Sequence, residues 1–97
     1  MEEYIYYNNL YDCYYELLTD KQRNYFEDYY FKNLSLSEIS DSYNVSRNAI
    51  YKQINLTKEK LEEYEYKLKL FEKKQKLEKL AEKVNDKKIS NELKELL

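Results

Sequence analysis

A short segment of the chain carries the residue types and the helical spacing that nucleic-acid recognition uses. Arg47 can reach a guanine edge or a phosphate, and Asn48 can pair with an adenine. Ser46 precedes a helix start, where the hydroxyl and the free backbone amides can hold a phosphate. If Ile50 and Ile54 face the protein interior, helical periodicity turns one set of residues outward. This set is Ser46, Arg47, Asn48, Tyr51, Lys52 and Asn55.

A second candidate set is a row of lysines further along the chain. Residues 67–88 contain nine lysines and four acidic side chains. On a helical wheel Lys69, Lys73 and Lys76 fall near Lys83 and clear of the apolar positions, provided that any helix break near residue 75 is small. Such a row attracts phosphates whatever the base sequence. The alternative is a solvated helix face that only keeps the protein soluble.

The groups that catalytic and metal sites need are scarce. The chain has no histidine and a single cysteine, Cys13, which excludes an intramolecular disulfide and a cysteine metal cluster. The carboxylates are dispersed, and none converges with a glycine-rich loop or with metal-ligand spacing. We therefore expect no catalytic residue, no cofactor, no metal site and no enzyme activity. Cys13 shares a helical face with Tyr6, Leu10 and Leu17, so its thiol should be buried and inert.

The composition favours an all-α fold, because glycine and proline, the two main helix breakers, are both absent. A first helix is predicted from Glu2 to Leu18. A second runs from the capping box of Thr19 and Gln22 to about Phe31, and its inward residues are Tyr25, Phe26, Tyr29 and Tyr30. The thirteen tyrosines could stack on bases, but we favour their use as core aromatics.

Residues 34–54, LSLSEISDSYNVSRNAIYKQI, predict the helix-turn-helix that positions the first candidate set. Ser35 and Glu38 form a capping box, and Ser46 caps the next helix. Asn44 tolerates the left-handed conformation that the turn needs. The expected inward residues are Ile39, Tyr43, Val45, Ile50 and Ile54. Two core helices of another bundle are the alternative.

The second helix of this motif should continue well past the motif itself. The positions Ile50, Ile54, Thr57, Leu61, Tyr64, Leu68 and Phe71 alternate spacings of four and three. We therefore predict one long helix to about Lys73, with residues 1–73 forming the helix-turn-helix domain. Residues 74–97 would form a basic helical extension that turns near residues 85–88.

Charge is distributed unevenly along the chain. Residues 1–46 hold three basic and nine acidic side chains, and residues 47–97 hold fourteen basic and ten acidic. Such a distribution suits an anionic partner or the pairing of opposite faces between subunits. The tyrosine-rich first helix and the seam from Leu61 to Phe71 also offer more apolar surface than a small domain covers. We therefore expect a homodimer. With no apolar run of membrane-spanning length and no signal peptide, we expect a cytoplasmic protein.

Four short sequence motifs, taken in their order along the chain, carry a family resemblance. They are LT..QRNY from Leu18, LS..EI from Leu34, VSR.A.Y from Val45 and LEEYE..L from Leu61. In these motifs the chain resembles region 4 of bacterial sigma factors, and more closely the small bacterial YlxM family of helix-turn-helix proteins. Ser40 and Asn44 depart from the Ala and Gly usual in sigma factors, and no other sigma region fits in so short a chain.

The resemblance implies a function. YlxM genes lie beside genes of the signal recognition particle, which implies a non-enzymatic accessory or regulatory role that involves a protein or RNA component of that particle. The alternative is a transcriptional regulator that binds DNA through the helix of residues 46–55. Arg47 and Lys52 are the two cations of the outward set, and Glu38 and Asp41 precede it. A monomer should therefore bind duplex DNA weakly.

Overall fold

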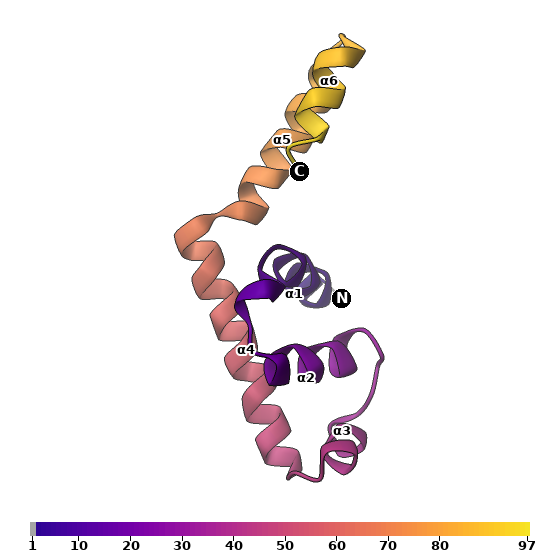
Figure 1. Ribbon diagram of the computed structural model, residues 1–97, viewed down its shortest axis with the longest axis vertical. Coiled ribbons are helices and arrows are strands. Elements are labelled where there is room, and N and C mark those ends of the chain that lie inside the picture. The colour runs from indigo at the N-terminus through magenta and orange to yellow at the C-terminus, as the bar shows by residue number, and fades with distance from the viewer. Residues whose placement is uncertain (1) are drawn as a thin grey trace.

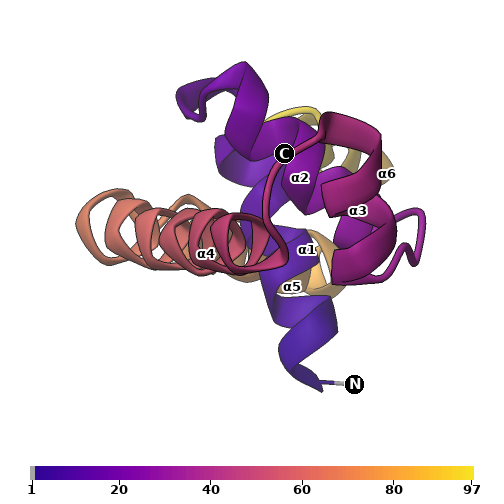
Figure 2. The same cartoon turned by 90° about the horizontal axis from the view of Figure 1, so that it is seen from below.

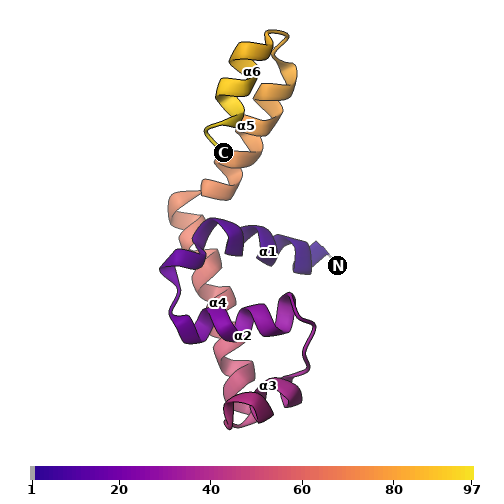
Figure 3. The ribbon, with the colours of Figure 1, turned by 45° about the vertical axis from the view of Figure 1, so that its right-hand side comes forward.

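The computed structural model describes residues 2–97, and no strand occurs among them. The helices are α1 (Glu2–Tyr14), α2 (Asp20–Tyr30), α3 (Leu36–Tyr43), α4 (Arg47–Leu68), α5 (Leu70–Lys83) and α6 (Lys87–Lys94), with a 3-10 turn at Tyr15–Leu17. The predicted all-α fold class is confirmed. Helices α1, α2 and α3 pack against α4, on one side of it (Figures 1 and 2), and α5 and α6 form a hairpin beyond its end (Figure 3). The molecule is elongated, at 55 × 25 × 22 Å.

The predicted capping residues of the helix-turn-helix lie where the sequence indicates. The Ser35 hydroxyl accepts from the Glu38 amide at 3.1 Å, and the Glu38 carboxylate accepts from the Ser35 amide at 3.1 Å. The Ser46 hydroxyl accepts from the Ala49 amide at 3.1 Å. Asn44, between the two helices, is left-handed with φ 55°. The two caps fix where α3 and α4 begin, and Asn44 marks the end of α3.

Tyrosine rings make up much of the core, and carboxylates at its edge accept from their hydroxyl groups. The Tyr11 ring stacks on Phe26, with centroids 4.6 Å apart, and its hydroxyl donates to Glu27 at 2.8 Å. Tyr7 donates to Glu62 in the same way. A buried phenol therefore keeps its hydrogen bond while the ring fills the interior, as a core tyrosine must.

Several predicted orientations are wrong. Tyr29, Tyr43 and Val45, expected inward, are exposed. The Tyr43 ring packs edge-to-face with Tyr25, and the Tyr43 hydroxyl donates to Asp28 at 3.0 Å. Tyr43 therefore lies at the surface and not in the core. In α1 the sequence offers two adjacent apolar faces, and the packing of α2 and α4 selects one of them. The buried residues of α1 are Tyr7, Leu10, Tyr11 and Tyr14, while Tyr6 is exposed and Cys13 is half-buried.

The long helix ends earlier than predicted, at Leu68 instead of about Lys73. Lys69 is left-handed, with φ 55°, and α5 begins directly after it. The Glu65 carboxylate accepts from the backbone amides of Phe71 at 3.0 Å and of Glu72. The Tyr14 hydroxyl donates to Glu65 at 2.6 Å and accepts from the Leu70 amide at 2.9 Å. These bonds replace the helical hydrogen bonds that the break removes. The heptad spacing of the sequence therefore runs through a junction at which the helix is interrupted.

The tyrosine core predicts a loss of stability at alkaline pH. Burial, and then the hydrogen bond to Glu65, raise the pKa of Tyr14 to about 12. Burial and carboxylate partners also raise the pKa of Tyr7 and of Tyr11. The folded chain therefore holds these protons more tightly than the unfolded chain, in which the pKa is about 10. The stabilisation is complete below about pH 10 and is lost as the pH rises towards about 12.

Urea melts at stepped pH, followed by circular dichroism, measure this loss. The unfolding midpoint should be steady near about pH 8 and fall steeply above about pH 10. A midpoint that stays constant up to about pH 11.5 would contradict the assignment of these phenols to the core.

Candidate nucleic-acid interface

The N-terminal half of α4 has one buried face and one exposed face. Ile50 and Ile54 are buried against the other helices, as predicted. Five residues of the first candidate set are exposed: Ser46, Arg47, Asn48, Tyr51 and Lys52. The sixth, Asn55, is half-buried. We call this set, with Asn55, the α4 face. Its side chains reach solvent because the isoleucines fix the rotation of the helix about its axis.

The α4 face is hollowed rather than flat. A shallow hollow of about 450 Å³ is lined by Ser46, Asn48, Ala49, Tyr51 and Lys52. A smaller one, of about 180 Å³, lies between α2 and α4, where Lys21 and Lys52 both line it. Lys21 thus adds a third positive charge beside Arg47 and Lys52. No sequence pattern indicated Lys21, because only the packing of α2 on α4 brings it to this surface.

The charges of the α4 face are available to a ligand. Among residues 2–97, neither Arg47 nor Lys52 forms an ion pair. The N-terminus of α4 also carries the partial positive charge of a helix dipole. Of the two acidic residues on α3, Glu38 uses its carboxylate in the capping box and Asp41 is exposed. The face can therefore offer positive charge and amide groups to an anionic polymer.

The lysine set occupies a different part of the molecule. Lys69 lies outside both helices, at the left-handed junction, so it does not continue the row that Lys73 and Lys76 begin on α5. Lys76 pairs with Glu72 at 3.4 Å, and Lys73 lines a hollow between α1 and α5. A helix of 22 residues spans about 33 Å. The two candidate sets therefore lie towards opposite ends of α4 (Figure 1), and the structure does not bring them together.

Comparison with known proteins decides the family. The sequence profile of the helix-turn-helix proteins described as YlxM / p13 like matches residues 1–97, the whole chain. The chain belongs to this family. A UPF0122 protein of Shouchella clausii is 58% identical over 66 residues, which cover 68% of this chain and 61% of that relative. UPF0122 proteins of Oceanobacillus iheyensis and Geobacillus sp. are 52% and 51% identical, over 79% and 81% of this chain and 73% and 72% of theirs.

Two other features of this YlxM-family chain bear on its site. Within residues 2–97, no helix combines the length and the apolar character that crossing a bilayer requires. In the same residues, no three side chains of the kinds that hold metals gather in one place. In helix-turn-helix proteins that bind DNA, the second helix of the motif enters the major groove, and α4 is the second helix of the motif in this chain.

Proposed function

We propose that this protein binds nucleic acid through the α4 face and acts as a non-enzymatic accessory or regulatory protein of the signal recognition particle pathway, in the cytoplasm. The observation that carries the proposal is the two-sided character of α4. Ile50 and Ile54 lock the helix into the core, and Arg47, Asn48 and Lys52 are left free on the outside. Membership of a helix-turn-helix family supports the binding class. The pathway comes from the family resemblance drawn from the sequence.

RNA of the particle is the partner that the charges favour. Neutralisation of phosphates supplies a large share of the affinity for duplex DNA, and the α4 face with Lys21 offers three cations, Lys21, Arg47 and Lys52. RNA loops are recognised through stacking and base edges as well as charge, which suits Tyr51 and Asn48. Lys69, Lys73 and Lys76 would add phosphate contacts at a distance. A protein component of the particle is a further candidate partner.

A DNA-binding transcriptional regulator is the second candidate function. One observation favours it: Arg47 and Asn48 stand in the first turn of the exposed motif helix, where helix-turn-helix proteins contact base edges. Two such faces from a dimer would double the available cations.

Salt-dependent binding tests the proposed function. Fluorescence anisotropy would follow the wild-type chain binding to signal recognition particle RNA, to duplex DNA and to the purified protein component, each at stepped salt. We expect RNA binding whose logarithm falls linearly with the logarithm of salt, by about 0.7–0.9 for each neutralised phosphate. Binding only to duplex DNA would favour the second candidate. Failure to bind either nucleic acid would refute the binding role.

We also infer that the chain forms a homodimer. Large apolar side chains are exposed on the α5–α6 hairpin, among them Leu80 and Ile89, and Leu96 is exposed just after α6. The hairpin belongs to the half of the chain with net positive charge, and the first half has net negative charge because it holds few basic residues. A second copy can satisfy both features, and closed dimers are the commonest assembly. Sedimentation equilibrium should therefore find dimers at micromolar concentration, and monomers alone would contradict this inference.

A further inference from the structure

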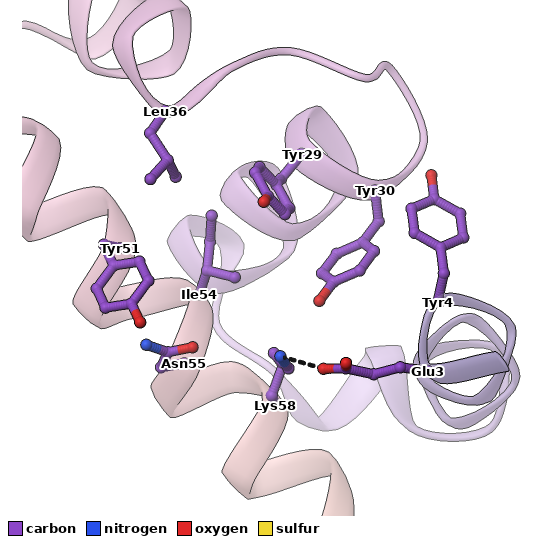
Figure 4. A pocket seen from close by; sticks show the side chains of 9 residues that line it. All are labelled: Glu3, Tyr4, Tyr29, Tyr30, Leu36, Tyr51, Ile54, Asn55 and Lys58. Atoms are coloured by element: carbon purple, nitrogen blue, oxygen red, sulfur yellow. Dashed lines mark hydrogen bonds and ion pairs between the residues drawn. The ribbon is translucent and has the colours of Figure 1, made fainter. Parts of the chain in front are cut away.

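A cavity of about 320 Å³ opens next to the α4 face, between helices that are far apart in the sequence. Four of its nine lining residues are tyrosines: Tyr4 from α1, Tyr29 and Tyr30 from α2, and Tyr51 from α4. Asn55 and Lys58 approach it from α4 as well (Figure 4). We call this space the tyrosine cavity.

The tyrosines of the cavity differ in their exposure. Tyr30 is buried in the core, and the ring of half-buried Tyr4 packs against it with centroids 5.0 Å apart. Tyr29 is 37% exposed and Tyr51 is 56% exposed. These two therefore keep ring surface that the protein itself does not cover. A planar ligand could stack on them without disturbing the core.

The polar groups of the cavity restrict the chemistry of that ligand. The Lys58 ammonium pairs with the Glu3 carboxylate at 2.9 Å (Figure 4), so an isolated phosphate would meet a negative charge beside the positive one. An aliphatic chain would offer no hydrogen-bonding group to the Asn55 amide. A flat heterocycle with donors and acceptors on its edge can use both the rings and the polar groups. A nucleobase has these properties.

The position of the cavity connects it to the α4 face. Tyr51 lines both the tyrosine cavity and the hollow that Ser46, Asn48 and Lys52 line. A strand whose phosphates lie near Arg47 and Lys52 would therefore carry a base past Tyr51 to the cavity. Its volume lies at the lower end of the range for small-molecule sites, about 300–1,000 Å³, which suits one base better than a larger ligand.

We propose that the tyrosine cavity receives one unstacked nucleobase of a single-stranded segment whose backbone lies along the α4 face. This inference rests on the proposed function and names the form of nucleic acid that the site takes. Bases paired in a duplex cannot enter the cavity. The chain should therefore prefer a single strand or a loop to a duplex of the same sequence.

A fluorescent adenine analogue, placed in the middle of a short oligonucleotide, tests the proposal. The probes are a single-stranded RNA, the corresponding single-stranded DNA and the DNA duplex. The chain contains no tryptophan, so the emission of the analogue is read without interference. Stacking on tyrosine should quench the analogue when the single strand binds. Tyr29→Ala should abolish most of the quenching and weaken single-strand binding about tenfold, the loss of one stacked base, and should leave duplex binding unchanged.

Two matched variants serve as controls for Tyr29→Ala. Tyr29→Phe keeps the ring and should keep the quenching. Tyr66→Ala removes a tyrosine of α4 that is 82% exposed and lies outside the cavity, so it should behave as wild type. Quenching with RNA, with DNA or with both supports the proposal and identifies the source of the base.

Three outcomes would overturn the proposal. Wild-type quenching and affinity in Tyr29→Ala would exclude the cavity while leaving nucleic-acid binding by the α4 face intact. Equal weakening of single-strand and duplex binding would mean that Tyr29 acts through structure, which a lowered melting temperature would corroborate. Binding to none of the three probes would refute the proposed function, and this inference with it.

Discussion

Replacing Ile50 by Ala should lower the free energy of unfolding by about 2–5 kcal/mol, the usual cost of truncating a buried aliphatic side chain. Ile50 is 0% exposed and shares the core cluster with Ile39, at the point where α3 packs on α4. The substitution leaves a void that the surrounding core residues can close only in part. A small domain has about 5–15 kcal/mol of stability, so the loss is a large share of the total.

Urea denaturation gives the measurement, and Leu56→Ala is its matched control. Leu56 is an aliphatic residue on the same helix, but it is 46% exposed, so its truncation should cost less than about 1 kcal/mol. If Ile50→Ala also cost less than about 1 kcal/mol, Ile50 would not hold α4 in the core. The rotation of α4 that exposes Arg47 would then lose its explanation.

Replacing Arg47 by Ala should weaken RNA binding by about 5- to 140-fold, because a lost arginine contact costs about 1–3 kcal/mol. The slope of the logarithm of affinity against the logarithm of salt should also become shallower by about 0.7–0.9, the contribution of one neutralised phosphate. Arg47 is exposed at the first position of α4, so the melting temperature should not change. The comparison variant changes Lys69, Lys73 and Lys76 together to Gln. Because these lysines lie beyond the other end of α4, we expect a smaller loss from three charges than from Arg47 alone.

The opposite order of effects would assign binding to the lysine set. If the triple variant abolished binding and Arg47→Ala bound RNA as wild type does, the α4 face would be a scaffold and the basic hairpin the interface. Circular dichroism spectra of both variants serve as the control for folding.

The parts of the fold that the sequence predicts are those that local interactions decide. Ser35 and Glu38 lie three residues apart, and Asn44 adopts its conformation within the turn that it forms, so both signals can be read along the chain. The end of α4 could not be read in this way. It depends on Glu65 capping a helix that begins later and on Tyr14, which is distant in sequence, bonding to the Leu70 amide.

The candidate site also has one part that the sequence predicts and one part that it does not. The α4 face follows from Ile50 and Ile54, because helical periodicity alone determines which residues are opposite to them. The tyrosine cavity does not follow from any pattern, because Tyr4, Tyr29 and Tyr51 come from three helices whose packing creates it. The same packing makes Tyr29 a surface residue, although its place in the apolar stripe of α2 predicted an inward one.

Amide chemical-shift mapping by NMR tests the central claim, that the α4 face binds nucleic acid, most directly. The isotope-labelled chain would be titrated with signal recognition particle RNA at low salt. We expect the largest shift changes at residues 46–55, with weaker changes at Lys21 and Tyr29 from α2. Changes confined to residues 70–94, on the α5–α6 hairpin, would contradict the claim, and so would a spectrum that RNA leaves unchanged.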